Sequence, residues 1–288
     1  GPALVTGGAG TGKTVVALHR AKALADALPE GSNKKILFTT FHPSLAEMIK
    51  RDLFLLGGEK LLDAVDVMPI GSLRAKALEG TPLHELTPIG DKEAYESWNQ
   101  VVENSGTRFT GEALHSEWEH LILANNIASE LEYVHFSPVE GEELPDSDSR
   151  KEIWRLVEEF ECLIREKGEM SFFQLSNAAS NHLTLNELFF YEHVVVDEAQ
   201  DLHGSHWRLL RSVVPEGPND MFIVGDSDQR IYDNRASLDV AGIKISDRSA
   251  HLWINYRTSI EIADWASSLL GERRITRIEG ADQHEGSK

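Results

Sequence analysis

Short apolar runs rich in β-branched and aromatic residues alternate with longer stretches of mixed polarity along this chain of 288 residues. Such runs are typical of strands buried in a sheet, and the longer stretches are typical of helices. The expected strands lie at residues 4–6, 36–41, 65–70, 194–196, 221–224 and 251–254. Because strands and helices alternate, the pattern predicts an α/β fold in which a parallel sheet carries helices on both faces.

The middle of the chain, from about residue 76 to residue 186, has a mostly helical pattern instead. Residues 141–149 form a polar stretch that is typical of an exposed loop, and residues 150–168 have the pattern of an amphipathic helix. Residues 259–270 also read as a helix. The sequence therefore predicts a helical insertion within an α/β domain.

The string GGAGTGKT lies between the first expected strand and a helix at residues 14–28. It fits the spacing of a phosphate-binding loop. Glycines let backbone N–H groups approach phosphate closely, and a helix N-terminus favours an anion. We expect Lys13 to contact the β- and γ-phosphates of ATP and the Thr14 hydroxyl to bind Mg²⁺. The predicted nucleotide-binding residues of the loop are Gly7, Gly8, Ala9, Gly10, Thr11, Gly12, Lys13 and Thr14.

A second string, VVVDEAQD at residues 194–201, is an apolar run that ends in two acids. The run suits a central parallel strand, and open α/β sheets bind ligands at the carboxyl ends of their strands. Asp197 is therefore a candidate Mg²⁺ ligand. Glu198 is a candidate base that orients or deprotonates the attacking water.

Four strings, in their order and spacing, resemble motifs of superfamily 1 helicases of the UvrD/Rep type. TTFHPSLAEMI at 39–49 is similar to motif Ia, and DEAQD at 197–201 is similar to motif II. FIVGDSDQRIYD at 222–233 resembles motif III, and INYRTS at 254–259 resembles motif IV. The resemblance implies a P-loop NTPase of the RecA-like class.

The same resemblance implies the domain organisation. Residues 1–75 and 187–257 would form a discontinuous RecA-like ATPase domain (1A), and residues 76–186 would form the helical insertion (1B). Residues 258–288 would begin a second RecA-like domain. The motifs expected after motif IV and the glutamine motif expected before the phosphate loop do not occur in the sequence. We therefore expect a fragment whose parent chain holds the rest of the second domain, and slow turnover without duplex unwinding in isolation.

At the nucleotide, the resemblance implies three further roles. Gln229 would sense the γ-phosphate, and Arg257 would contact it as an arginine finger supplied in cis. Tyr256 would stack on the base of the nucleotide. The predicted catalytic residues are therefore Glu198, Gln229 and Arg257.

At the nucleic acid, the resemblance implies that Phe41 and Tyr232 stack on bases of a single strand. Thr40 and Arg235 would contact its backbone. The residues at 230–232 resemble the UvrD/Rep branch, which moves 3′ to 5′ on single-stranded DNA. The expected function is thus an ATP-dependent DNA helicase or translocase that uses ATP and Mg²⁺.

The sequence departs from the family pattern at three places. Asn234 stands where the family has a tryptophan that stacks on DNA, and Gly71 replaces the usual histidine of motif Ib. Residues 42–44 (His-Pro-Ser) replace a polar-Asn-Lys sequence in motif Ia, so one positive charge is lost. A second interpretation therefore stays open: a non-unwinding ATP-dependent switch that is derived from a helicase and acts through protein partners.

The formal net charge of −19 also opposes strong binding to nucleic acid, because proteins that neutralise phosphates usually carry a basic face.

The single cysteine, Cys162, excludes an internal disulfide framework and fits a reducing cytoplasm. No apolar run approaches the length needed to span a bilayer, so we expect a cytoplasmic protein with no membrane partner. For His203 and His206, which could share a helix face, we expect a structural role rather than metal binding.

Overall fold

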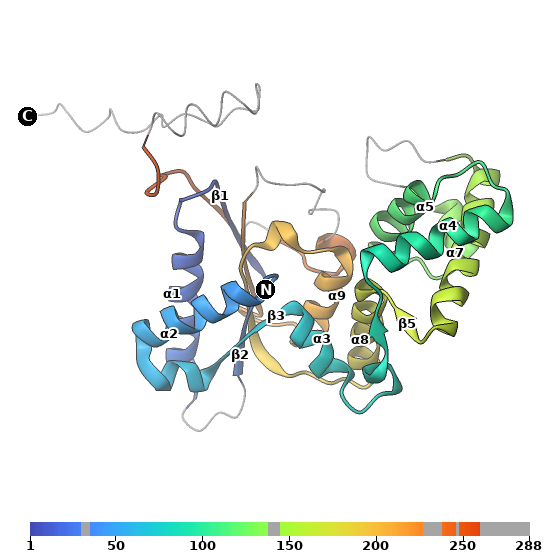
Figure 1. The fold of residues 1–288 in the computed structure, drawn as a ribbon. Coiled ribbons are helices and arrows are strands. Elements are labelled where there is room, and N and C mark those ends of the chain that lie inside the picture. The colour runs from blue at the N-terminus through green and yellow to red at the C-terminus, as the bar shows by residue number, and fades with distance from the viewer. Residues whose placement is uncertain (30–34, 138–144, 227–237, 246–247, 260–288) are drawn as a thin grey trace, which may run out of the picture.

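A six-stranded, entirely parallel sheet forms the centre of the fold, with strand order β3-β2-β6-β7-β1-β8 (Figure 1). The computed structural model describes residues 1–29, 35–137, 145–226, 238–245 and 248–259. The strands of this sheet are β1 (Ala3–Gly7), β2 (Lys35–Thr40), β3 (Val65–Pro69), β6 (Tyr191–Val196), β7 (Met221–Gly225) and β8 (Ser249–Leu252).

Helices cover both faces of the sheet. α1 (Lys13–Ala27) and α2 (Pro43–Ala64) pack on one face. α3 (Ile70–Leu78), α8 (Phe172–Leu185) and α9 (Gly204–Ser212) pack on the other (Figure 1). The predicted α/β fold with helices on both faces is confirmed.

The strands supply two hydrophobic cores, because successive side chains of a strand point to opposite faces. Ile36 and Phe38 of β2 join the core beneath α1 and α2, and Leu37 between them joins the core beneath the other helices. In β6, Val194 and Val195 divide in the same way. Strands buried on both faces read as continuous apolar runs, which is the pattern seen in the sequence.

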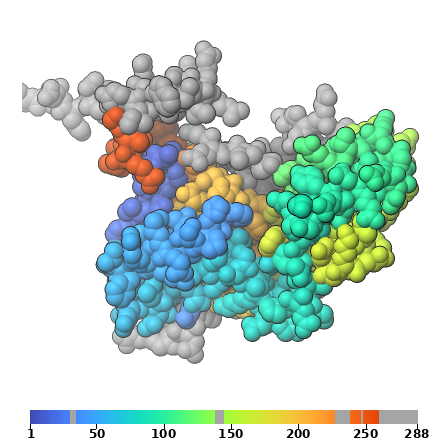
Figure 2. Space-filling view, viewed as in Figure 1, coloured from blue at the N-terminus to red at the C-terminus, as the bar shows by residue number. Residues whose placement is uncertain are grey.

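The segment between α3 and α8 is helical and has a core of its own, and its residues form a lobe beside the sheet domain (Figure 2). In this core the rings of Trp98 and Phe160 stack with centroids 3.9 Å apart, and Trp118 packs edge-on against both. The helices of the lobe are α4 (Asp91–Ser105), α5 (Gly111–Glu117), the π-helix η2 (Trp118–Leu123), α6 (Glu130–His135) and α7 (Ser147–Glu166).

The lobe leaves and rejoins the sheet domain at one place. Past the short 3₁₀ helix η1 (Pro82–Glu85), strand β4 (Thr87–Pro88) pairs in parallel with β5 (Glu169–Met170). These two-residue strands lie immediately before and after the helices of the lobe. The two ends of the lobe are therefore hydrogen-bonded to each other. The separate core supports the predicted helical insertion, while the exact domain boundaries stay a prediction.

Some element boundaries differ from those expected. α7 begins at Ser147, inside the stretch expected to be a loop, because the Asp146 carboxylate accepts hydrogen bonds from the amides of Asp148 and Ser149 and caps the helix. β8 ends at Leu252 rather than at residue 254, and the side chains of Trp253 and Ile254 are exposed. The predicted helix at 259–270 lies outside the described residues, apart from its first position. Among the described residues, every helix is too short or too polar to cross a membrane.

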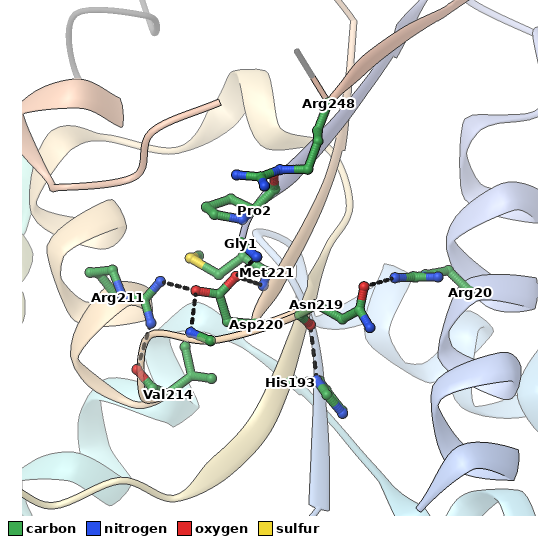
Figure 3. Close-up of polar contacts among 11 residues, drawn as sticks. Gly1, Pro2, Arg20, His193, Arg211, Val214, Asn219, Asp220, Met221 and Arg248 are labelled. Atoms are coloured by element: carbon green, nitrogen blue, oxygen red, sulfur yellow. Dashed lines mark hydrogen bonds and ion pairs between the residues drawn. The ribbon is translucent and has the colours of Figure 1, made fainter. Parts of the chain in front are cut away.

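Polar contacts, some of them buried, fasten the edge of the sheet where β1 and β7 begin (Figure 3). The Asp220 carboxylate accepts hydrogen bonds from the Met221 amide at 2.9 Å and from Arg211 Nη1 at 2.9 Å. Arg211 and Asp220 form an ion pair, and both side chains are largely buried. Arg248, before β8, donates from Nε to the Pro2 carbonyl at 2.8 Å. These contacts fix the starts of β1, β7 and β8, the strands whose opposite ends reach the candidate site.

Candidate nucleotide and nucleic-acid site

The loop between β1 and α1 has the backbone of a phosphate-binding loop. Gly10 and Gly12 adopt positive φ angles of 78° and 88°, which glycine adopts without a steric penalty. Gly12 is the N-cap of α1 and has no side chain that could cap the helix. The N–H groups of the first turn of α1 are therefore available to an anion.

Lys13 is buried at the start of α1, and its ammonium group bends back over the loop. Its Nζ donates to the carbonyls of Gly7 at 2.8 Å and Gly8 at 2.9 Å. The same Nζ lies 3.8 Å from Oδ2 of Asp226, the residue that follows β7. The ammonium group is thus placed between the loop and the carboxyl end of a neighbouring strand.

Asp197 extends β6 and is fully buried. Its amide donates to the Thr39 carbonyl at 3.0 Å, and its Oδ1 accepts from the Glu198 amide at 3.0 Å. The pKa of Asp197 is raised to about 6: burial, the largest cause, and the Glu198 charge raise it, while the Thr14 hydroxyl, the Glu198 amide and the Lys13 charge lower it. The structure therefore brings Thr14, Lys13 and Asp197 together, as the sequence led us to expect.

The carboxyl group of Asp197 also tests whether the site fits a cation. Its Oδ2 is buried and has no hydrogen-bond partner among the described residues. A buried carboxylate oxygen that lacks a partner is costly unless a cation or a proton satisfies it. Together with the neighbouring Thr14 hydroxyl, this oxygen belongs to the hard oxygen donors that Mg²⁺ prefers. The residues present fit a magnesium ion.

Glu198 has a left-handed backbone conformation, with φ 52° and ψ 48°. Its Oε2 accepts a hydrogen bond of 2.6 Å from Nε2 of Gln200, in the 3₁₀ helix η3 (Ala199–Asp201). Oε1 of Gln200 in turn accepts from the Asp226 amide at 2.9 Å. The Gln200 side chain therefore bridges Glu198 and the end of β7.

Gln200 and Asp226 were not among the predicted site residues. The sequence carried a signal for Asp226, since the apolar run of β7 ends in an acid just as β6 does. It carried no comparable signal for Gln200, because that contact depends on β6 and β7 being neighbours in the sheet.

The segment after β8 reaches the phosphate loop from the other side. The Tyr256 amide donates to the Gly10 carbonyl at 3.0 Å. Oδ1 of Asn255 accepts from the amides of Arg257 at 2.8 Å and Thr258 at 3.2 Å, which shapes the turn. The Tyr256 and Arg257 side chains are exposed. The structure thus places the backbone of both predicted residues at the loop.

The predicted nucleic-acid contacts are described only in part. Phe41 follows β2, is 38% exposed and makes an edge contact with His42. Thr40 is fully buried, and its hydroxyl has no partner within the described part of the chain. Tyr232 and Arg235 lie outside the described residues, as do Gln229 and Asn234.

His203 and His206 hold the first turn of α9 against the lobe. His203 is the N-cap of α9, and its Nε2 lies 2.9 Å from the Glu119 carbonyl. Its ring stacks on Phe173, and His206 Nδ1 accepts from the His203 amide at 3.2 Å. Burial lowers the pKa of His203 to about 4 and that of His206 to about 3. Both imidazoles therefore occupy structural positions.

Arg208 adds a second connection between α9 and the lobe. It donates to the carbonyls of Leu123 at 2.7 Å and Ala124 at 2.8 Å, and to Oδ1 of Asn177. A side chain at Gly204 would collide with the Ala124 carbonyl. The helix that follows the twin acids is therefore in direct contact with the lobe.

A family model described as the UvrD/REP helicase N-terminal domain matches residues 1–241. The chain belongs to this family. The match covers the phosphate loop, the twin acids and the helical lobe, so the UvrD/REP assignment agrees with the sheet and the loop described above.

Curated proteins described as ATP-dependent DNA helicases, one of them as putative, are similar to most of the chain. A putative ATP-dependent DNA helicase of Bacillus subtilis (strain 168), YjcD, is 26% identical over 302 residues, which is 95% of this chain and 37% of the relative. The ATP-dependent DNA helicase UvrD1 of Mycobacterium tuberculosis (strain ATCC 25618 / H37Rv) is 25% identical over 313 residues, which is 98% of this chain and 40% of the relative. The chain thus spans about two fifths of the length of these relatives.

Proposed function

We propose that this chain carries the nucleotide-binding part of an ATP-dependent DNA helicase or translocase, which hydrolyses ATP and moves 3′ to 5′ on single-stranded DNA. The observation that carries the proposal is the convergence of Lys13, Thr14 and the buried Asp197 at one edge of the sheet. The names of the relatives, both described as ATP-dependent DNA helicases, support the same conclusion.

In the proposed reaction, the loop amides and the Lys13 ammonium group bind the β- and γ-phosphates of ATP. Lys13 would exchange its present contacts with the loop carbonyls for contacts with phosphate oxygens. Thr14 and Asp197 would hold Mg²⁺, which when bound neutralises charge on the phosphates. Asp197 would then be ionised, because a bound cation lowers the pKa of its ligands.

Glu198 would orient the attacking water and accept its proton at a carboxylate oxygen. The hydrogen bond from Gln200 Nε2 holds one of the two oxygens, Oε2, and fixes the orientation of the group. Arg257 would turn its exposed guanidinium group toward the γ-phosphate as an arginine finger, and Tyr256 would stack on the adenine. Gln229 would sense the γ-phosphate. These roles rest on the family resemblance and on the backbone position of the 255–257 segment.

For the nucleic acid, we propose that Phe41 and Tyr232 stack on bases while Thr40 and Arg235 contact the strand backbone. Partial exposure of Phe41 supports its part. We further propose that residues 1–75 and 187–257 form the ATPase domain, 76–186 the insertion and 258–288 the beginning of a second RecA-like domain. The greater length of the relatives supports a parent chain with more of that second domain.

Three variants test the chemistry. Lys13→Ala should lose nucleotide binding. In the full-length protein, Glu198→Gln should bind Mg²⁺ and ATP as the unmutated protein does and lose about 10²- to 10⁴-fold in turnover, because the metal ligand remains and the base is gone. Glu96→Gln, on the exposed face of the lobe, removes the same charge away from the site and should change neither quantity. Turnover of Glu198→Gln equal to that of Glu96→Gln would show that the base is another residue.

Binding of a labelled single-stranded oligonucleotide tests the substrate. Fluorescence anisotropy at low salt should rise with protein concentration and fall again as salt is added, because the phosphate contacts are electrostatic. A flat anisotropy signal from protein that still binds nucleotide would instead favour the partner-dependent switch.

A further inference from the structure

Three large apolar side chains are exposed in the turn that joins α8 to β6, and together they form what we call the turn patch. Leu185 is 83% exposed, Leu188 is 41% exposed and Phe189 is 55% exposed. Every residue from 184 to 189 is exposed. Single exposed apolar residues are normal, whereas a contiguous group of them commonly marks an interaction site.

The turn patch lies at the edge of the sheet opposite the proposed nucleotide site. β6 begins at Tyr191, just after the patch, and ends at Val196, just before Asp197. A strand of this length spans about 20 Å. In Figure 1 the chain between α8 and β6 runs along the lower edge of the sheet, away from the phosphate loop that follows β1. The patch is therefore separate from the proposed nucleotide site and from Phe41, which follows the carboxyl end of β2.

Hydrogen bonds fix the backbone of this turn. The Leu188 amide donates to the Leu183 carbonyl at 3.0 Å, and the Glu187 amide donates to the Thr184 carbonyl at 3.3 Å. This is the Schellman arrangement, which satisfies the last carbonyls of a helix. Beyond the turn, the Phe190 amide donates to the C-cap carbonyl of α9 at 2.9 Å. The apolar side chains are thus held outward by a defined backbone.

Glu187 occupies a position in the turn that is unfavourable for it. Its φ angle of 52° is left-handed, a conformation that glycine adopts at the end of a helix without a steric penalty. Its carboxylate also lies just past the C-terminus of α8, where the helix dipole disfavours negative charge. An acidic side chain therefore stands beside the turn patch although it lowers the stability of α8, and a bound positive charge would offset the electrostatic part of that loss.

The surroundings of the turn patch add negative rather than positive charge. Residues 168–207 contain neither lysine nor arginine. Glu216, which follows shortly after α9, is exposed. Lys76 lies over the ring of Phe190, but its Nζ is 3.7 Å from Asp66 Oδ2, so that carboxylate offsets its charge. The patch is therefore an apolar surface beside an unbalanced negative charge.

We infer that the turn patch docks a basic amphipathic segment of a partner protein. The apolar face of that segment would cover Leu185, Leu188 and Phe189, and its lysines or arginines would meet Glu187 and the negative end of the α8 dipole. Burial of the apolar side chains would supply the affinity, and the charges would select the partner. An acidic segment or a nucleic acid would place like charges together. The inference does not depend on the proposed function, because the patch is remote from that site.

The test uses the full-length protein and a fluorescein-labelled peptide of about 18 residues that carries leucine on one helical face and lysine on the other. The fluorescence anisotropy of this lysine peptide should rise with protein concentration. Added salt should weaken the binding, because the ionic contacts are exposed. A peptide with glutamate in place of every lysine should not bind, and equal binding of the two peptides would show that the charge argument is wrong.

Two pairs of variants locate the binding. Leu185→Gln removes an apolar contact from a side chain that is too exposed to support the fold, and it should weaken binding of the lysine peptide about tenfold. Its control is Leu131→Gln on α6, where the leucine is 71% exposed and binding should not change. Glu187→Gly should weaken binding about threefold while the urea midpoint of unfolding stays the same or rises. Its control is Glu103→Gln, which removes an exposed acid near the end of α4 and should leave binding unchanged.

Three outcomes would overturn the inference. If Leu185→Gln and Leu131→Gln bind the lysine peptide equally, the peptide is held by negative charge elsewhere on the protein. If the unmutated full-length protein does not bind the peptide, the patch is covered or does not bind a segment of this kind. If sedimentation velocity without peptide shows a dimer that Leu185→Gln dissociates, the patch belongs to an interface with a second copy of the chain. The proposed function stands under each of these outcomes.

Discussion

Alanine at Gly10 should separate the phosphate loop from the segment that carries Arg257. A Cβ atom at Gly10 would lie 2.5 Å from Asn255 Oδ1 and 2.7 Å from the Arg257 Cβ. Non-bonded contacts of this kind settle at about 3.5 Å or more, so the segment has to move by about 1 Å. Since a misplacement of about 1 Å at a catalytic group can cost about 100-fold in rate, we expect turnover to fall by about that factor.

The assay compares steady-state ATP turnover, nucleotide affinity and thermal unfolding of Gly10→Ala with those of Gly106→Ala. Gly106 also has a positive φ, 63°, but a Cβ atom there would meet nothing within 4 Å. Both variants therefore carry backbone strain of about 1–2 kcal/mol, and only Gly10→Ala displaces residues 255–257. Equal turnover in the two variants would refute the claim that this segment contributes to catalysis through its contact with Gly10.

Two further predictions concern stability. Asp220→Ala should lower the free energy of unfolding, measured by urea titration, by about 3–5 kcal/mol, because the largely buried Arg211 loses its ion-pair partner. The control is Asp26→Ala, which breaks the exposed pair between Lys22 and Asp26. Equal losses of unfolding free energy in the two variants would contradict the reasoning. The lowered pKa of His206 means that its neutral form stabilises the fold fully above about pH 6.5, and that this contribution is lost as pH falls toward about 3. His206→Gln should therefore show a shallower loss of unfolding free energy on acidification, by up to about 1.4 kcal/mol per pH unit, and an unchanged slope would rule this out.

The local features of the site could be predicted from the sequence because they depend on short stretches. The glycine spacing predicted the loop, and the apolar run at 194–196 predicted a central strand ending in Asp197. What brings Asp197 to Thr14, however, is the strand order, in which β6 and β7 separate β2 from β1. No single stretch of sequence encodes that order, so the expectation that the two strings meet came from the general rule that open α/β sheets bind ligands at the carboxyl ends of their strands.

Side-chain contacts between different helices and strands could not be predicted from short stretches of sequence. Gln200 is one residue among several in DEAQD, and its bridge from Glu198 to Asp226 exists only because β6 and β7 are adjacent. His203 was expected to be structural, yet its use as an N-cap could not be read from composition, since histidine is not a preferred capping residue. The pairing of His115 with Glu119, by contrast, follows helical i, i+4 spacing.

The parallel pairing of β4 with β5 makes the helical lobe a detachable module of the chain. Because Thr87 pairs with Glu169 and Pro88 with Met170, the peptide enters and leaves the lobe through one narrow stem. An inserted module whose two ends meet can be lengthened, shortened or exchanged for another while the strands of the host sheet keep their register. A transplanted lobe would need a matching two-strand stem and a surface that fits both α8 and α9, since Asn177 and Phe173 of α8 also contact the lobe.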